Sequence, residues 1–80
     1  MAVAKKVSVP NLRRGVAILE YLATNQRSAT ITELSERLGY PAASVLRIAK
    51  ELTELGYLAR DRATKRFRLT NKFLLLGQLQ

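Results

Sequence analysis

The chain has 80 residues and a formal net charge of +8, from 14 Lys and Arg against 6 Asp and Glu, and it contains neither histidine nor cysteine. This length fits one domain, because folding buries only about 60% of the surface of so short a chain. Without Cys or His, disulfides, zinc or haem ligation and Ser-His or Cys-His nucleophilic chemistry are excluded, so we expect no cofactor, no metal site and no catalytic residues.

Positive charge is concentrated near the two ends of the sequence. Residues 1–14 hold four basic and no acidic residues, residues 15–56 hold four basic and five acidic residues, and residues 57–72 hold six basic residues and one acidic residue. A local excess of positive charge indicates a polyanionic partner, and the alternative is a solvated surface that binds nothing. No segment approaches 18 consecutive apolar residues, so we expect a soluble, intracellular chain without membrane contact.

Residues 1–10 lack periodicity and are predicted to form a flexible arm. The first helix is predicted from Asn11, its cap, to about Asn25, because apolar residues recur there at helical spacing. The apolar stripe consists of Leu12, Val16, Ile18, Leu19, Leu22 and Ala23. Its arc is broader than a small core needs, and Tyr21 and Ala17 lie on the far side, which allows contact with a second subunit.

A short strand at residues 29–31 is predicted to precede a second, short helix that ends at Gly39. Thr32 is the expected cap of this helix, although Thr30 has the capping-box spacing to Glu33, so the start is open by two residues. A turn as tight as the one at Gly39 makes the second and third helices cross at a steep angle.

The third helix is predicted from Pro41, whose fixed φ and missing N–H suit the first helical position, to about Leu55, with Gly56 as its stop signal. The inner face is expected to carry Val45, Ile48, Leu52 and Leu55. The outer face carries Ala43, Leu46, Arg47, Lys50 and Glu54.

Residues 57–61 and 66–70 alternate with period two and are predicted to form a β-hairpin. The side chains expected to face inward are Tyr57, Ala59, Phe67 and Leu69, and those expected outward are Arg60, Arg66 and Arg68. Residues 71–80 are predicted to begin a final helix that is too apolar for a free tail. For its leucines, Leu74, Leu75, Leu76 and Leu79, contact with a second subunit is favoured over a local core.

The order of helix, short strand, helix, tight turn, helix and basic hairpin is that of a winged helix-turn-helix, a mainly α fold with a three-helix core and a small hairpin as the wing. Such a domain is predicted over residues 11–70, with residues 71–80 as the start of a linker and dimerisation helix. The major groove of B-form DNA accepts one helix, so the third helix is expected to present its outer face to base edges. An arginine-rich hairpin beside it reaches flanking phosphates or the minor groove.

Several sequence fragments occur in a characteristic order, namely Val9 to Arg14, Ala17-Ile18-Leu19, Thr32-Glu33-Leu34, Leu38 to Pro41, Gly56-Tyr57-Leu58 and Arg66 to Leu69. Through them, roughly residues 8–77 resemble the N-terminal DNA-binding domain of IclR-family bacterial transcription regulators. The resemblance implies a homodimer, with the first helix and the linker helix in the dimer contact. It also implies a pseudo-palindromic operator and a small-molecule effector bound by a C-terminal domain absent from this chain.

Two departures from the family pattern bear on DNA recognition. Ala42, Ala43 and Leu46 are apolar where the family usually has polar side chains, and Ala43 and Leu46 are therefore candidates to contact thymine methyl groups. The side chains left for hydrogen bonds to bases are Ser44, Arg47 and Lys50. Lys65 stands where the family favours glycine, so a looser or differently shaped wing turn is expected.

We predict DNA contacts from the recognition helix, from the wing and from two flanking positions. The recognition-helix residues are Pro41, Ala42, Ala43, Ser44, Leu46, Arg47 and Lys50. The wing residues are Arg60, Arg62, Lys65, Arg66 and Arg68, and the flanking residues are Thr32 and Tyr40. The predicted dimer contacts are Tyr21, Leu74, Leu75 and Leu79.

Four of these residues have a second interpretation. Arg47 and Lys50 would otherwise lie on a solvated helix face that also carries glutamates. Ser44 either bonds a phosphate or caps the first helical turn. Tyr40 either bonds a phosphate through its hydroxyl or packs against the proline that follows it.

The predicted function is sequence-specific binding of duplex DNA by a cytoplasmic, nucleoid-associated bacterial regulator that acts as a repressor or a dual regulator. The alternative is a winged-helix protein-interaction module with only non-specific affinity for nucleic acid. An enzyme is not expected, because the carboxylates are scattered along helix faces and the four glycines form no phosphate-cradling loop.

Overall fold

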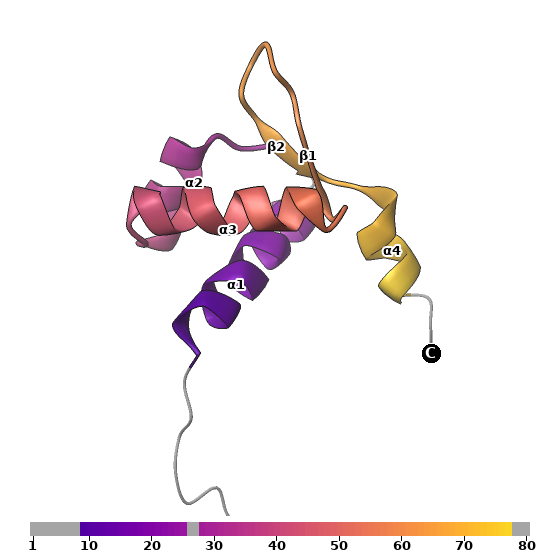
Figure 1. Cartoon of the computed structure of the whole chain (residues 1–80), viewed down its shortest axis with the longest axis horizontal. Helices are drawn as coiled ribbons and strands as arrows, with labels where there is room; N and C mark the ends of the chain where they lie inside the picture. The colour runs from indigo at the N-terminus through magenta and orange to yellow at the C-terminus, as the bar shows by residue number, and fades with distance from the viewer. Residues whose placement is uncertain (1–8, 26–27, 78–80) are drawn as a thin grey trace, which may run out of the picture.

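A computed structural model describes residues 9–25 and 28–77, apart from the side chains of Asn25, Phe73 and Leu74. The elements in chain order are α1 (Pro10–Asn25), α2 (Ile31–Leu38), α3 (Ala42–Glu54), β1 (Leu58–Arg60), β2 (Phe67–Leu69) and α4 (Asn71–Gly77). Figure 1 shows α3 lying across α1, with α2 beside one end of α3 and the hairpin and α4 near its other end. This is the predicted winged helix-turn-helix, in which β1 and β2 form the wing.

The core takes side chains from α1, α2, α3, both strands and the segment before α2. Its members are Ile18, Leu22, Ala29, Leu34, Val45, Ala49, Leu58 and Phe67, none of them more than 2% exposed. Burial of these apolar side chains supplies the main free energy of folding. Leu55, which the pattern places on the inner face, is instead exposed because α3 ends at Glu54.

The helix starts differ from the predicted ones by one or two residues. The carbonyl of Val9 accepts a bond from the Arg13 N–H at 3.0 Å, so α1 begins at Pro10 and Asn11 is not its cap. Thr30 caps α2, because its hydroxyl accepts from the N–H of Glu33 at 3.1 Å. Its own N–H donates to that glutamate's carboxylate at 3.2 Å. The capping-box alternative is therefore confirmed and the Thr32 cap is wrong.

The turn between α2 and α3 is held by backbone and side-chain bonds around one serine. Gly39 has a φ of 74°, a left-handed conformation that glycine adopts without steric penalty. The N–H groups of Gly39 and Tyr40 both donate to the carbonyl of Ser35, and the Ser35 hydroxyl donates to the carbonyl of Tyr40 at 2.6 Å. Pro41 follows as the residue before α3 rather than as its first residue.

The C-terminal end of α3 is bonded to the start of α4. Gly56 has a φ of 92°, and the N–H of Tyr57 donates to the carbonyl of Leu52, as in a Schellman motif. From the α4 side, the Thr70 hydroxyl donates to the carbonyl of Gly56 at 2.6 Å and the Lys72 ammonium donates to the carbonyl of Leu55 at 2.8 Å. These two side chains link the recognition helix to the element that follows the wing.

The strand register corrects the predicted inward face of the first strand. The antiparallel pairs are Leu58 with Leu69, Ala59 with Arg68 and Arg60 with Phe67. Side chains alternate with period two, so buried Leu58 faces inward and Ala59 faces away with Arg68, opposite to the prediction for Tyr57 and Ala59. Leu58, the larger apolar side chain, is thus the one that occupies the core.

The wing loop connects the strands through a residue with positive φ. The N–H of Asp61 donates to the carbonyl of Arg66 at 2.8 Å, and the Asp61 carboxylate accepts from the N–H groups of Ala63 and Thr64. These backbone hydrogen bonds, that of Thr64 first, lower the pKa of Asp61. Lys65 completes the loop with a φ of 61°, where a side chain is strained and glycine is not.

Lys65→Gly is expected to stabilise the fold by about 0.5–1 kcal/mol, because it removes the left-handed strain at this position. Ala63→Gly, in the same loop but without a positive φ, should instead lower stability through added backbone freedom in the unfolded chain. Urea unfolding followed by circular dichroism measures both. A lower midpoint for Lys65→Gly would show that the turn does not strain this residue.

Candidate nucleic-acid interface

The outer face of α3 changes from apolar to basic along its length. Pro41, Ala42, Ala43 and Leu46 are exposed at the N-terminal end, and Arg47 and Lys50 are exposed in the following turns. Among the described residues the sole ion pair is that of Arg66 with Glu33, so Arg47 and Lys50 are not neutralised by the glutamates of α3. This face therefore offers two cations to a ligand.

Ser44 lies in a different place from the one that its predicted role requires. It is only 9% exposed, and its hydroxyl accepts a hydrogen bond from Nη1 of Arg14 at 3.0 Å. It makes no cap for α3, since no side-chain hydrogen bond caps this helix. Ser44 is therefore a contact between α1 and α3 rather than a group on the outer face, and neither predicted role is supported.

Arg14 joins the N-terminal end of α3 to the turn before it. Besides bonding Ser44, its guanidinium carbon lies 5.4 Å from the centre of the Tyr40 ring, within range of a cation–π contact. Tyr40 is half-buried and packs against the core, so its ring serves packing. Because Pro41 leaves α3 without a side-chain cap, the first N–H groups of the helix remain available to a phosphate.

Four of the five predicted wing cations are exposed, and one is not free. Arg60, Arg62, Lys65 and Arg68 lie on the surface. Arg68 projects from the outward side of β2, paired with Ala59. The guanidinium of Arg60 lies 5.4 Å from the centre of the Phe67 ring, on the inward side of β1 at the end of the strand. Thr32, in the first turn of α2, is also exposed.

Arg66 is the exception, because it bonds the wing to the start of α2. Its Nε and Nη2 donate to the hydroxyl and carbonyl of Ser28, both at 2.8 Å. Its Nη2 and Nη1 donate to the Glu33 carboxylate at 2.9 and 3.2 Å. The bonds from Arg66, and then the Thr30 N–H, lower the pKa of Glu33. Arg66 is therefore not a free outward cation as predicted, and its predicted contact with phosphate stays a prediction.

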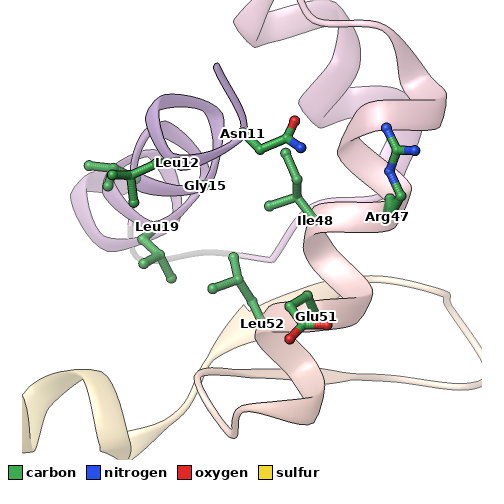
Figure 2. A pocket seen from close by; sticks show the side chains of 9 residues that line it. Asn11, Leu12, Gly15, Leu19, Arg47, Ile48, Glu51 and Leu52 are labelled. Atoms are coloured by element: carbon green, nitrogen blue, oxygen red, sulfur yellow. The ribbon is translucent and has the colours of Figure 1, made fainter. Parts of the chain in front are cut away.

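An apolar groove of about 400 Å³ runs between α1 and α3. Figure 2 shows Leu19, Ile48 and Leu52 facing it from the two helices, with Arg47 on the α3 side, and Leu12 also lines it. Leu12 is 65% exposed, and Val16, which also lines the groove, is exposed as well. The predicted apolar arc of the first helix is broader than the core needs, and the structure leaves Leu12 and Val16 on its uncovered part.

The predicted dimer residues fall into three groups. Tyr21 is half-buried and packs against the core, not on a far side of α1. Leu75 of α4 is 59% exposed, and its neighbour Leu76 is exposed too. Leu79 lies outside the described residues, and so does the side chain of Leu74. Residues 1–8 of the arm predicted over residues 1–10 lie outside them as well.

The described part of the chain presents no helix of the length and apolarity that a bilayer span requires. In the same residues, acidic side chains form no group of three or more that would hold a metal ion. The fold and the exposed cations thus define a winged helix-turn-helix domain with a basic face formed by α3 and the wing.

Comparison with known proteins places this domain in a family. The model of the IclR helix-turn-helix domain matches residues 11–62, and the chain belongs to that family. It is 32% identical over 68 residues to the DNA-binding transcriptional repressor YiaJ of Escherichia coli, and 36% identical over 67 residues to the Pca regulon regulatory protein of Pseudomonas putida. The alignments cover 85% and 84% of this chain but only 24% and 22% of those proteins.

Solved structures agree with this assignment. An IclR-family transcriptional regulator from Brucella abortus superposes with a TM-score of 0.82 at 26% identity, over 98% of this chain and 31% of that one. The repressor BlcR of Agrobacterium tumefaciens superposes with a TM-score of 0.75 at 34% identity, over 89% and 28% of the two chains. The present chain thus spans between a fifth and a third of the length of these relatives. The curated relatives are regulators and not enzymes.

Arg66→Ala is expected to lower the urea midpoint of unfolding, because it leaves Ser28 and Glu33 without their shared partner. Arg68→Ala removes the same side chain from an exposed position two residues away and should change stability by less than about 0.5 kcal/mol. Arg66→Lys should not restore the midpoint, since a single ammonium cannot bond both residues in a fork. Equal midpoints for the two alanine variants would contradict this role.

Proposed function

We propose that this chain is the DNA-binding domain of a bacterial transcription regulator and binds duplex DNA in a sequence-specific manner. The observation that carries the proposal is the set of exposed cations on the outer side of α3 and on the wing, which together are called the basic face. Its six unpaired cations are Arg47, Lys50, Arg60, Arg62, Lys65 and Arg68. The names of the relatives, a DNA-binding repressor among them, support the same function.

In this proposal α3 lies in the major groove with its N-terminal end deepest. Arg47 donates two parallel hydrogen bonds to guanine, and Lys50 reaches a guanine or a phosphate. The free N–H groups at the start of α3 donate hydrogen bonds to a phosphate, whose negative charge the positive end of the helix dipole attracts. The exposed wing cations bind flanking phosphates or enter the minor groove, so their contribution is sensitive to salt.

We further propose that the domain works as a homodimer on a pseudo-palindromic operator. Two exposed apolar surfaces support this: Leu12 and Val16 on α1, and Leu75 and Leu76 on α4. Figure 1 shows that the N-terminal half of α1 and all of α4 extend to the same side of α3, away from the tip of the wing. A partner covering both surfaces would leave the wing free to contact DNA.

The relatives are about three to four times as long as this chain, so we propose that effector binding belongs to sequence beyond these 80 residues. Within a whole regulator we propose repression or dual regulation in the bacterial cytoplasm, at the nucleoid.

Selection from a randomised duplex pool followed by salt titration tests DNA binding. We expect an enriched inverted repeat. The logarithm of the binding constant should fall with the logarithm of the salt concentration with a slope of about −5 per bound chain, since six cations release the counterions of about six phosphates. Arg47→Ala should relax the preference at one position by about 1–3 kcal/mol, whereas Arg62→Ala should weaken binding to all sequences and reduce the slope by about 1.

A different result would favour the interaction-module alternative. If no motif is enriched and affinity falls with salt alike for the wild type and Arg47→Ala, the helix does not read bases. The apolar residues at the start of α3 would then be candidates for contact with another protein.

Leu12→Glu is expected to shift the chain from dimer to monomer in sedimentation equilibrium, because it places a charge in the apolar contact. Thr24→Glu, at an exposed position elsewhere on α1, is the matched control and should leave the assembly unchanged. An unchanged dimer for Leu12→Glu would remove this stripe from the interface.

A further inference from the structure

Residues 41–46, at the start of α3, expose no side chain that forms hydrogen bonds. From residue 41 to residue 46 the exposed side chains are Pro41, Ala42, Ala43 and Leu46. Val45 is fully buried, and Ser44, the one hydroxyl in this stretch, is buried and bonded to Arg14. Hydrogen-bonding side chains on this face therefore begin only at Arg47.

The exposed side chain of Leu46 offers an apolar surface that an apolar group of a partner can cover. Leu46 is 38% exposed and lies one turn from Ala43 on the same face, with Arg47 next to it. The cations that surround these side chains, Arg47 and Lys50 on α3 and the wing beyond, make a polyanion the complementary occupant. A duplex satisfies both requirements, because its major groove displays an apolar group among polar base edges.

That group is the methyl on C5 of thymine. It forms no hydrogen bonds, and apolar side chains contact it. Ala43 and Leu46 are three residues apart, so their Cβ atoms are about 5–6 Å apart. Base pairs are stacked about 3.4 Å apart along each strand, so two such side chains face neighbouring base pairs. Opposite other bases, the same side chains leave donors and acceptors unpaired, which disfavours those sequences.

This inference rests on the proposed DNA binding. We infer that Ala43 and Leu46 select a pyrimidine that carries a methyl group on C5, next to a base that Arg47 contacts. The recognised chemistry is the methyl group and not the hydrogen-bonding edge of thymine. The same site therefore distinguishes 5-methylcytosine from cytosine, and binding responds to cytosine methylation at these positions.

Replacing single thymines by deoxyuridine in a selected duplex tests this inference. Uracil keeps every hydrogen-bonding group of thymine and lacks only the methyl, so the change leaves the protein and the charge of the DNA untouched. At the position that faces Leu46, we expect about a fourfold loss of affinity per half-site, the equivalent of one buried methyl group. At the same position, 5-methylcytosine should bind about fourfold more tightly than cytosine.

Two variants assign the effect to a residue. Leu46→Ala, an exposed substitution, should bind the thymine duplex about as weakly as the wild type binds the uracil duplex, and its ratio of the two affinities should fall toward one. Arg47→Ala is the matched control. This variant should bind more weakly but keep the fourfold ratio of thymine to uracil affinity, because Arg47 does not contact the methyl group.

The outcomes separate this inference from the function on which it rests. A selected half-site without thymine, or a ratio near one at every thymine with specific binding intact, overturns methyl recognition and leaves DNA binding in place. Unchanged binding of all duplexes by Leu46→Ala also overturns it and assigns the apolar face to a protein partner. If selection recovers no site, the proposed function fails and this inference fails with it.

Discussion

The arrangement of the basic face depends on the bonds that join the start of β2 to the segment before α2. Phe67 is buried in the core and exchanges two backbone hydrogen bonds with Ala29, at 2.8 and 3.0 Å. Arg66, beside it, bonds Ser28 and Glu33, and Glu33 in turn completes the cap of α2. A hairpin of two three-residue strands is marginal by itself, so these contacts determine where the wing lies relative to α2 and α3.

The recognition helix is held at both ends by side chains from other elements. At its N-terminal end Arg14 of α1 bonds Ser44, and at its C-terminal end Thr70 and Lys72 bond the carbonyls of Gly56 and Leu55. The outer face between these points is left free. Because Lys72 belongs to α4, its bond to Leu55 ties the position of the end of α3 to that of α4.

Charge in this chain has two separate uses. Arg14, Arg66 and Lys72 donate hydrogen bonds to other groups of the fold. The six cations of the basic face have no acidic partner among the described residues. Counting basic residues therefore overstates the number of donors that DNA would meet, although of Arg14, Arg66 and Lys72 only Arg66 also has its charge paired within the described part of the chain. The apolar start of α3 limits polar contacts further: in the proposed complex fewer polar side chains than expected would face the bases, and methyl contacts would take their place.

Much of the fold was predictable because its signals are local. The helical periods, the capping box of Thr30 and Glu33, and the glycines after α2 and α3 act within a few residues, and together with the fragment order they identify the family. What only the tertiary structure decided is the role of single side chains. Ser44 and Arg14 are 30 residues apart, and Arg66 and Ser28 are 38 apart. No local pattern reports such pairs, because they form only when packing brings distant segments together.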